Sequence, residues 1–400
     1  MAIQFIDSAD ALEKIGGKNV LARFDFNVPL HKENGTITDT TRVDRALETI
    51  KLILEQKPKK LILMSHLGRP KGESNPKFSL EPVAGYLAEK LEQDVTLTES
   101  ATDASIKTLL SLQDSQVILL ENLRFHKEET DCDSEFAKKI ASYGDIFVHD
   151  AFGTAHRKHA STYEIIRYFP RNAYAGLLLK KEILALSKVV ETPESPFVAI
   201  VGGAKVSDKI KILESLLPNV DSLLIGGAMA YPFLKAKGFE VGKSLCLDED
   251  VELAKRLLKQ STASKIILPV DHIASDSPDG EATKLNDENI PDDLMALDIG
   301  ERTLALYSDK LASAKTVLWN GPMGFFEKEN FAKGSFGVAE ALAKLDSAFT
   351  LVGGGDSVSA VMKSGLASKI SHISTGGGAS LEFIENGTLP GIQALKFGLN

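Results

Sequence analysis

Four glycine clusters are the residues of this sequence whose type and spacing most directly suggest chemistry. Gly202–Gly203, Gly226–Gly227, Gly353–Gly355 and Gly376–Gly378 each follow a short apolar run. Backbone N–H groups without neighbouring side chains let phosphate oxygens approach closely, above all where a helix begins. A single glycine pair is equally typical of a tight strand-to-helix turn. Four such clusters in one half of the chain favour binding of a nucleotide.

Charged and polar residues accompany these clusters. Lys205 and Lys209 follow the first cluster and lie four residues apart, which would place them on one face of a helix. Asp356 directly follows the third cluster, where it could hold Mg²⁺ or cap a helix. Asn320 follows another apolar run, and Glu327 could accept hydrogen bonds from ribose hydroxyls. Neither GxxxxGK[ST] nor GxGxxG is present, and solvated surface lysines and glutamates remain the alternative.

The first half of the chain carries a different set of groups at its expected strand ends. Six of the ten arginines precede residue 160, and guanidinium groups match carboxylates and phosphates with paired hydrogen bonds. Several converging arginines and histidines would bind a small polyanion, although any one of them could form a surface salt bridge instead. The residues concerned are Asp25, Asn27, Arg42, His66, Arg69, Arg124, His156, Arg157 and His159.

The elements that must position these groups alternate between short apolar strands and longer helices. Nearly continuous apolar runs such as KLILMSH, FVAIVGG and FTLVGGG are typical of parallel strands covered on both faces. In such sheets ligands bind beyond the carboxyl ends of the strands. We therefore predict an α/β fold with two doubly wound, Rossmann-like parallel-sheet domains of similar size. Residues 1–171 form the first, a linker helix and hinge covers 172–192, and residues 193–385 form the second.

Length and composition restrict the class of protein. Four hundred residues exceed one ordinary core, and a net charge of −9 with pI ≈ 5.5 disfavours nucleic acid or anionic membranes as partners. No apolar run is long enough for a membrane span, and the N-terminus shows no signal pattern. Two cysteines, Cys132 and Cys246, make no disulfide framework or metal motif. These features indicate a cytoplasmic protein.

Taken in order, eight motifs of the chain resemble those of the phosphoglycerate kinase family. They are ARFDFNVP, SHLGRP, LLENLRF, DAFGTAHR, GGAKVSDK, WNGPMGFFE, VGGGDS and STGGGAS, and they extend over the whole chain. The sequence departs from the usual pattern at Ala22, at His149 in place of an asparagine, at Ala228 in place of a third glycine, and at Ser357 in place of a threonine. None of these changes removes a residue that the resemblance assigns to a ligand.

The resemblance implies specific roles. It assigns Arg42, Lys205, Gly376, Gly377 and Gly378 to catalysis and Asp356 to a Mg²⁺ cofactor. The 3-phosphoglycerate or 1,3-bisphosphoglycerate site would comprise Asp25, Phe26, Asn27, Arg42, His66, Leu67, Gly68, Arg69, Arg124 and Arg157. The ATP or ADP site would comprise Gly203, Lys205, Lys209, Gly227, Asn320, Glu327, Gly354, Gly355, Asp356 and Ser357. It also implies a monomer whose C-terminal segment, about 386–400, returns to the first domain.

The implied reaction passes a phosphoryl group between 1,3-bisphosphoglycerate and MgADP without a covalent enzyme intermediate. Such transfer depends on positioning and on stabilising the charge of the equatorial phosphoryl oxygens, which Lys205, Arg42 and the amides of 376–378 would do. Hinge closure would bring the two ligands together and exclude water. A nicotinamide-dependent dehydrogenase and a two-lobed anion-binding protein are the alternatives. The first lacks its fingerprint here, and the second normally requires export.

Overall fold

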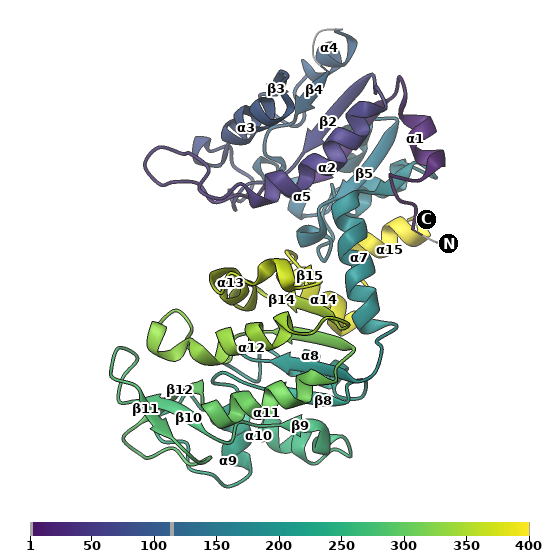
Figure 1. Ribbon diagram of the computed structural model, residues 1–400. Helices are drawn as coiled ribbons and strands as arrows, with labels where there is room; N and C mark the ends of the chain where they lie inside the picture. Colours follow the sequence, from purple (N-terminus) through teal and green to yellow (C-terminus); the bar gives the residue numbers. More distant parts are fainter. Residues whose placement is uncertain (1–2, 113–115, 400) are drawn as a thin grey trace. The chain divides into compact units, whose positions relative to one another are not determined.

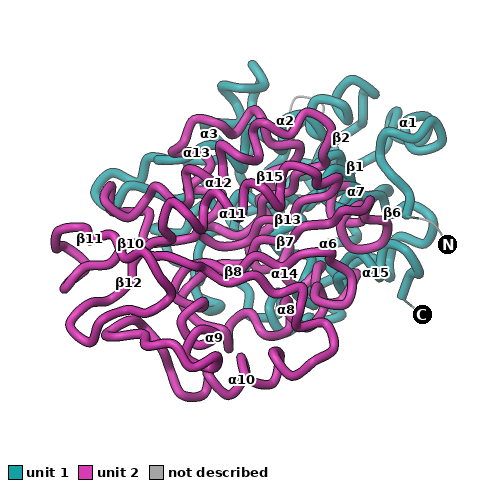
Figure 2. Tube along the Cα trace, turned by 60° about the horizontal axis from the view of Figure 1, so that its bottom comes forward, with its two compact units in different colours: residues 1–184, 388–400 teal, residues 185–387 magenta. Residues whose placement is uncertain are grey.

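The structure, a computed structural model, describes residues 3–112 and 116–399. Two compact units comprise residues 1–184 with 388–400 and residues 185–387 (Figure 2). Residues 1, 2, 113–115 and 400 of the expected first domain lie outside the described residues. Within the described part of the chain, no helix has the length and apolar character needed to cross a membrane.

The first unit is built on a six-stranded sheet in the order β3-β4-β2-β1-β5-β6, in which all neighbouring strands are parallel (Figure 1). Its strands are β1 Asn19–Phe24, β2 Lys60–Met64, β3 Val95–Leu97, β4 Val117–Leu119, β5 Ile146–Asp150 and β6 Ala173–Ala175. Its helices are α1 Ala9–Ile15, α2 Thr41–Glu55, α3 Glu81–Leu91, α4 Ile106–Ser111, α5 Lys127–Thr130, α6 Ser134–Ala141 and α15 Pro390–Phe397, with 3₁₀ turns η1 Pro76–Phe78, η2 Leu123–Phe125, η3 Phe152–Thr154 and η4 Glu164–Tyr168.

Helices cover both faces of this sheet because the strands are apolar on both sides. Val20 and Ala22 of β1 pack in one buried cluster with residues of α1, α2 and α3. Leu21, which alternates with them, packs in a second cluster with residues of α4, α6 and α15. The alternation follows from the two-residue period of a strand. The C-terminal helix α15 thus forms part of the core of the first unit.

The second unit contains another six-stranded parallel sheet, ordered β15-β14-β13-β7-β8-β9. Its strands are β7 Phe197–Val201, β8 Ser222–Ile225, β9 Ile266–Ile267, β13 Thr316–Asn320, β14 Phe349–Gly353 and β15 His372–Ile373. Its helices are α8 Ile210–Leu216, α9 Ala230–Ala236, α10 Asp248–Leu258, α11 Glu301–Ala312, α12 Lys333–Ala343, α13 Gly355–Lys363 and α14 Gly378–Asn386, with 3₁₀ turns η5 Ala263–Lys265, η6 Glu329–Phe331 and η7 Ala367–Lys369. The α/β class expected from the sequence is confirmed.

A small antiparallel sheet of the second unit differs from the expectation of parallel strands throughout. It consists of β10 His272–Ser275, β11 Thr283–Leu285 and β12 Met295–Ile299, in the order β11-β10-β12. The run MALDIG, expected in the parallel sheet, forms β12 here. β11 consists of two exposed polar residues, Thr283 and Lys284, followed by the half-buried Leu285, so it lacks the apolar run by which the other strands were found.

The helix expected over residues 172–192 begins later than predicted. Residues 173–175 form the edge strand β6, and the helix is α7, Leu177–Val190. Three residues paired to β5 are too short a run for periodicity to separate from the start of a helix. The division between the two units falls within α7, after Leu184, and the chain returns to the first unit at Thr388.

Candidate active site

The expected site residues of both units lie beyond the carboxyl ends of parallel strands, close to the point where the strand order reverses. In the first unit that point is the β1–β5 pair, and in the second it is the β7–β13 pair. Adjacent loops leave such strands in opposite directions, which opens a crevice where ligands bind in open α/β sheets.

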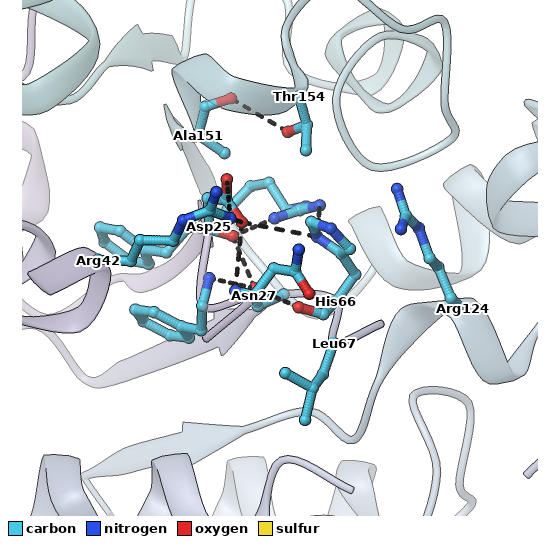
Figure 3. Close-up of polar contacts among 12 residues, drawn as sticks. Asp25, Asn27, Arg42, His66, Leu67, Arg124, Ala151 and Thr154 are labelled. Carbon is cyan, nitrogen blue, oxygen red and sulfur yellow. Dashed lines mark hydrogen bonds and ion pairs between the residues drawn. The ribbon is translucent and has the colours of Figure 1, made fainter. Parts of the chain in front are cut away.

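In the first unit, the loops after β1 and β2 form one polar cluster with the start of α2 (Figure 3). Arg42 Nη1 lies 3.2 Å from Asp25 Oδ2 and 3.3 Å from Oδ1. Asn27 Oδ1 accepts a hydrogen bond of 2.8 Å from the Gly68 amide. His66 is buried beside them, with its Nδ1 atom 3.9 Å from Asp25 Oδ1. Five predicted residues from three separate segments are therefore brought together.

Arg124 links this cluster to a pocket of about 500 Å³. Its Nη1 atom donates to the Gly68 carbonyl oxygen (2.8 Å), while its buried Nε atom has no hydrogen-bond partner among the described residues. Burial, followed by Arg23 and Arg157, lowers the pKa of Arg124 to about 10. An anion would satisfy both the orphaned donor and the uncompensated charge. The pocket lining comprises Arg69, Lys71, Gly72, Arg124, Lys127, Thr130, Asp131, Arg157 and His159.

Two predicted residues, Phe26 and Leu67, have side chains in the core. Phe26 is fully buried and stacks on Phe24 with ring centroids 5.4 Å apart. Its amide donates to Ser65 Oγ (2.8 Å), and the Leu67 amide donates to Asn122 Oδ1 (3.2 Å). Both amides are thus engaged within the protein, and these residues hold the loops in place.

A buried layer behind the cluster was missed by the sequence analysis. It consists of Arg23, Ser161 and Glu129, all fully buried. Arg23 Nε donates to Ser161 Oγ (2.9 Å), which donates to Glu129 Oε1 (2.7 Å). The one available signal was an arginine within the apolar run NVLARF, since burial of a charge in a strand requires partners.

In the second unit, the carboxyl ends of β7, β13 and β14 are joined by side chains. Lys209 Nζ donates to Asn320 Oδ1, and Asn320 Nδ2 donates to the Gly353 carbonyl oxygen (2.8 Å). Ser357 Oγ also donates to Gly353 (2.5 Å) and accepts from the Gly321 amide (3.1 Å). Burial lowers the pKa of Lys209, an effect that Asp356 and then Asp208 oppose. Lys209, Asn320 and Ser357 therefore form one network around the third glycine cluster.

The glycines of the four clusters have two different roles. A Cβ atom at Gly202 would lie 2.0 Å from the Pro322 carbonyl oxygen, and one at Gly227 would lie 2.8 Å from the Gly203 amide nitrogen. These glycines let backbone segments pack together. In contrast, a Cβ atom at Gly355 or Gly378 would meet nothing within 4 Å. These two residues begin α13 and α14, where N–H groups lack intrahelical acceptors, so an anion can approach them.

Lys205 and Lys209 do not share a helix face, so that sequence argument was wrong. Both residues precede α8, which begins at Ile210. They lie instead in the turns of 202–209, where Gly203 adopts a φ of +135°. Lys205 is exposed and Lys209 is half-buried. Glu327 and Asp356 are also exposed, and Asp356 lies in the first turn of α13.

Asp356 is suitable as one ligand of a divalent cation bound with a nucleotide. It is exposed and directly follows Gly355, where an added Cβ atom would meet nothing within 4 Å. Mg²⁺ takes oxygen ligands, keeps several waters and is commonly bound through one or two carboxylates together with substrate phosphates. Within the described residues, no group of three or more His, Cys, Asp and Glu side chains could hold a metal ion.

Comparison with known proteins identifies relatives over nearly the full length of the chain. A model of the family described as phosphoglycerate kinase matches residues 9–387. Proteins named phosphoglycerate kinase from Anaeromyxobacter sp. (strain Fw109-5) and Chlorobium chlorochromatii are 51% and 52% identical, covering 99% and 95% of this chain and 100% and 97% of their own. The solved structure of phosphoglycerate kinase from Coxiella burnetii is 43% identical, with a TM-score of 0.87 over 95% of this chain and 96% of that one. The enzyme from Pyrococcus horikoshii is 33% identical, with a TM-score of 0.81 over 98% of both chains.

Proposed function

Because this chain belongs to the phosphoglycerate kinase family, we propose that its two units divide the ligands of that family's reaction between them. The reaction is a step of glycolysis. It transfers a phosphoryl group reversibly between 1,3-bisphosphoglycerate and ADP, giving 3-phosphoglycerate and ATP. The enzyme is thus a phosphotransferase with a carboxyl group as acceptor, and the dehydrogenase and binding-protein alternatives are not favoured.

The first unit binds the phosphoglycerate in this proposal. Support comes from the orphaned Arg124 Nε atom and from the pocket that Arg69, Arg124 and Arg157 line together. Three guanidinium groups suit a dianionic phosphate. Arg42, His66 and Asn27 lie in the polar cluster beside that pocket and would contact the remainder of the substrate, with Asp25 orienting Arg42.

The second unit binds the nucleotide. The open starts of α13 and α14 at Gly355 and Gly378 would face its phosphates, and Lys209 would exchange its bond to Asn320 for a phosphate oxygen. Glu327 would accept from the ribose hydroxyls. Mg²⁺, with Asp356 as its ligand from the protein, would neutralise charge on the phosphate oxygens.

The chemical step requires little covalent participation by the protein. Phosphoryl transfer depends on alignment and on groups that stabilise charge at the equatorial oxygens. Exposed Lys205 and the N–H groups at the start of α14 supply that stabilisation from the second unit, and Arg42 supplies it from the first. The Gly376 amide takes little part, because it donates to Ser374 Oγ (3.3 Å).

Further parts of the proposal concern the state of the protein. We propose a monomer that acts in the cytoplasm, which agrees with its two free cysteines. We also propose that the chain is organised in three parts. Residues 1–171 with the C-terminal segment bind the phosphoglycerate, residues 172–192 are a linker, and residues 193–385 bind the nucleotide.

A coupled assay tests the function directly. Purified full-length protein should consume ATP only when both 3-phosphoglycerate and Mg²⁺ are present, as followed through NADH oxidation by added glyceraldehyde-3-phosphate dehydrogenase. The observation that carries the expectation is the family match over residues 9–387. Absence of NADH oxidation when ATP, 3-phosphoglycerate and Mg²⁺ are all present would contradict it.

A further inference from the structure

We propose that Arg23 is a positioning residue that fixes His66 as the neutral tautomer with its proton on Nε2, so that the ring donates a hydrogen bond to the anionic substrate. The inference rests on the proposed assignment of the phosphoglycerate to the first unit. It is carried by the contact between Arg23 Nη2 and His66 Nδ1, which are 3.2 Å apart and buried.

The direction of this hydrogen bond follows from the chemistry of arginine. A guanidinium has five N–H donors, no acceptor, and a charge that persists in proteins. Arg23 must therefore donate, and His66 Nδ1 must accept through its lone pair. A neutral imidazole that accepts at one nitrogen carries its proton on the other. Nε2–H is then the only N–H donor of the His66 ring.

Arg23 is held rigidly enough to enforce this choice. It is fully buried in β1, its Nη1 atom donates to the Phe24 carbonyl oxygen, and its Nε atom donates to Ser161 Oγ (2.9 Å). The Ser161 hydroxyl in turn donates to Glu129 Oε1, and the Ser161 amide donates to Glu129 Oε2 (3.0 Å). Glu129 supplies the buried negative charge that balances Arg23, so the guanidinium has a fixed position and a single orientation.

The charged groups around His66 also favour its neutral form. Arg23 from β1, Arg42 from α2 and Arg124 from η2 oppose a positive ring, as does His159. The Asp25 carboxylate faces Nδ1 as well, but at 3.9 Å it is beyond hydrogen-bond distance. Burial and then these cations hold the pKa of His66 well below its usual value.

The tautomer matters because the substrate offers oxygen lone pairs. With the proton on Nδ1, the ring would present the Nε2 lone pair to a carboxylate or phosphate, and the contact would be repulsive. With the proton on Nε2, it would donate. The Arg23–Ser161–Glu129 layer therefore determines whether His66 donates or accepts a hydrogen bond at Nε2, although none of these three residues would contact the substrate.

Long-range ¹H–¹⁵N correlation spectra of the ligand-free, full-length protein test this directly, since they distinguish the two neutral tautomers from imidazolium. His66→Gln identifies the signal of His66. We expect the Nε2–H tautomer throughout pH 6–8. A proton on Nδ1, or a doubly protonated ring, would overturn the proposal. Because no ligand is present, the outcome does not depend on which anion the unit binds and is separate from the test of enzymatic function.

Two variants then test the role of Arg23. Lysine is also a donor without an acceptor, so Arg23→Lys should keep the Nε2–H tautomer, whereas Arg23→Met should produce a mixture. In Arg23→Met the KM for 3-phosphoglycerate should rise roughly tenfold or more, and the KM for ATP should stay within twofold. If circular dichroism shows that Arg23→Met is unfolded, Arg23→Gln replaces it, because an amide can turn its oxygen toward Nδ1. An unchanged tautomer in the folded variant would remove Arg23 from this role.

Discussion

At the residue scale, the lysines and arginines of the two sites occupy distinct environments. Lys209 is half-buried and bonded to Asn320, and Arg124 is buried with one donor unsatisfied. Lys205 is exposed in the turns before α8. The first two have a geometry set by the fold. In the proposed reaction the exposed Lys205 side chain would follow the phosphoryl group as its charge shifts, which is the requirement for selective stabilisation of a transition state.

Replacing Lys205 with alanine should therefore reduce turnover far more than substrate affinity. Loss of one such contact typically lowers kcat by about 10²–10³, and the KM values should change little. Steady-state kinetics with both substrates measure this. Lys237→Ala provides a matched control, because Lys237 is an exposed lysine at the end of α9. A kcat for Lys205→Ala within threefold of the parent protein would show that Lys205 has no part in the chemistry.

Residue types identified several members of the candidate site. They could not distinguish residues that would contact a ligand from residues that hold the site in place. Asp25, Asn27 and His66, which were expected at strand ends, come together with Arg42, which was expected at the start of a helix. Phe26 and Leu67 instead pack into the core, and Arg23 lies behind the cluster in a strand position that the sequence marks as internal. The difference depends on which way a loop residue points, and a local pattern does not specify that direction.

At the element scale, we expect the N-termini of α13 and α14, at Gly355 and Gly378, to bind the phosphates of the nucleotide. Gly355→Ala should leave stability unchanged or slightly higher, because a Cβ atom there meets no protein atom within 4 Å and alanine favours helix. Affinity for nucleotide should fall roughly tenfold, since the methyl group would occupy the space of a phosphate oxygen. Calorimetric titration with ATP and denaturant unfolding measure the two effects.

Gly85→Ala in α3 is the control for this substitution, since its Cβ atom would also meet nothing and it lies in the first unit. It should raise stability and leave ATP binding unchanged. Parent-like ATP affinity in Gly355→Ala would mean that the third glycine cluster serves only the turn between β14 and α13.

The end of β5 provides an expectation for pH dependence. His149 is fully buried, its Nδ1 atom accepts from the Ala151 amide (3.2 Å), and burial followed by Arg23 lowers its pKa from 6.5 to about 3. An unfolded chain gains a proton on this residue below pH 6.5, whereas the folded protein resists protonation down to about pH 3. The stability present above pH 6.5 is therefore lost as the pH falls through this window.

His149→Asn should accordingly weaken the loss of stability between pH 7 and pH 4.5, because asparagine does not titrate. Urea unfolding at several pH values measures the slope, and His31→Asn, which replaces an exposed histidine, should leave it unchanged. Equal slopes in His149→Asn and the parent protein would show that His149 is not kept neutral by the fold.

Periodicity located most elements because parallel strands buried on both faces are continuous apolar runs. It failed where that condition is absent. The three-residue edge strand β6 was assigned to a helix, and polar β11 was not expected at all. In the antiparallel sheet, β10 pairs with β12, whose partner residues lie 20 to 27 positions further along the chain. It also pairs with the nearer strand β11. An apolar run in the sequence does not encode the direction in which a strand will pair.

At the scale of the whole molecule, one chain carries an arginine-lined pocket in one unit and a glycine-rich sheet edge in the other. Arginine side chains suit a small, densely charged substrate, whereas helix starts and backbone amides suit a chain of phosphates. The central claim is that each unit binds one ligand and that neither site substitutes for the other.

Reciprocal calorimetric titration of two full-length variants tests this claim most directly. Arg157→Ala should weaken 3-phosphoglycerate binding by about 1.5–3 kcal/mol, since one charged hydrogen bond is lost, and should leave MgATP binding within twofold. Asp356→Asn should weaken MgATP binding and spare 3-phosphoglycerate. Circular dichroism confirms that both variants are folded. Loss of both ligands in either variant, or the opposite pairing of variant and ligand, would contradict the division of ligands between the two units.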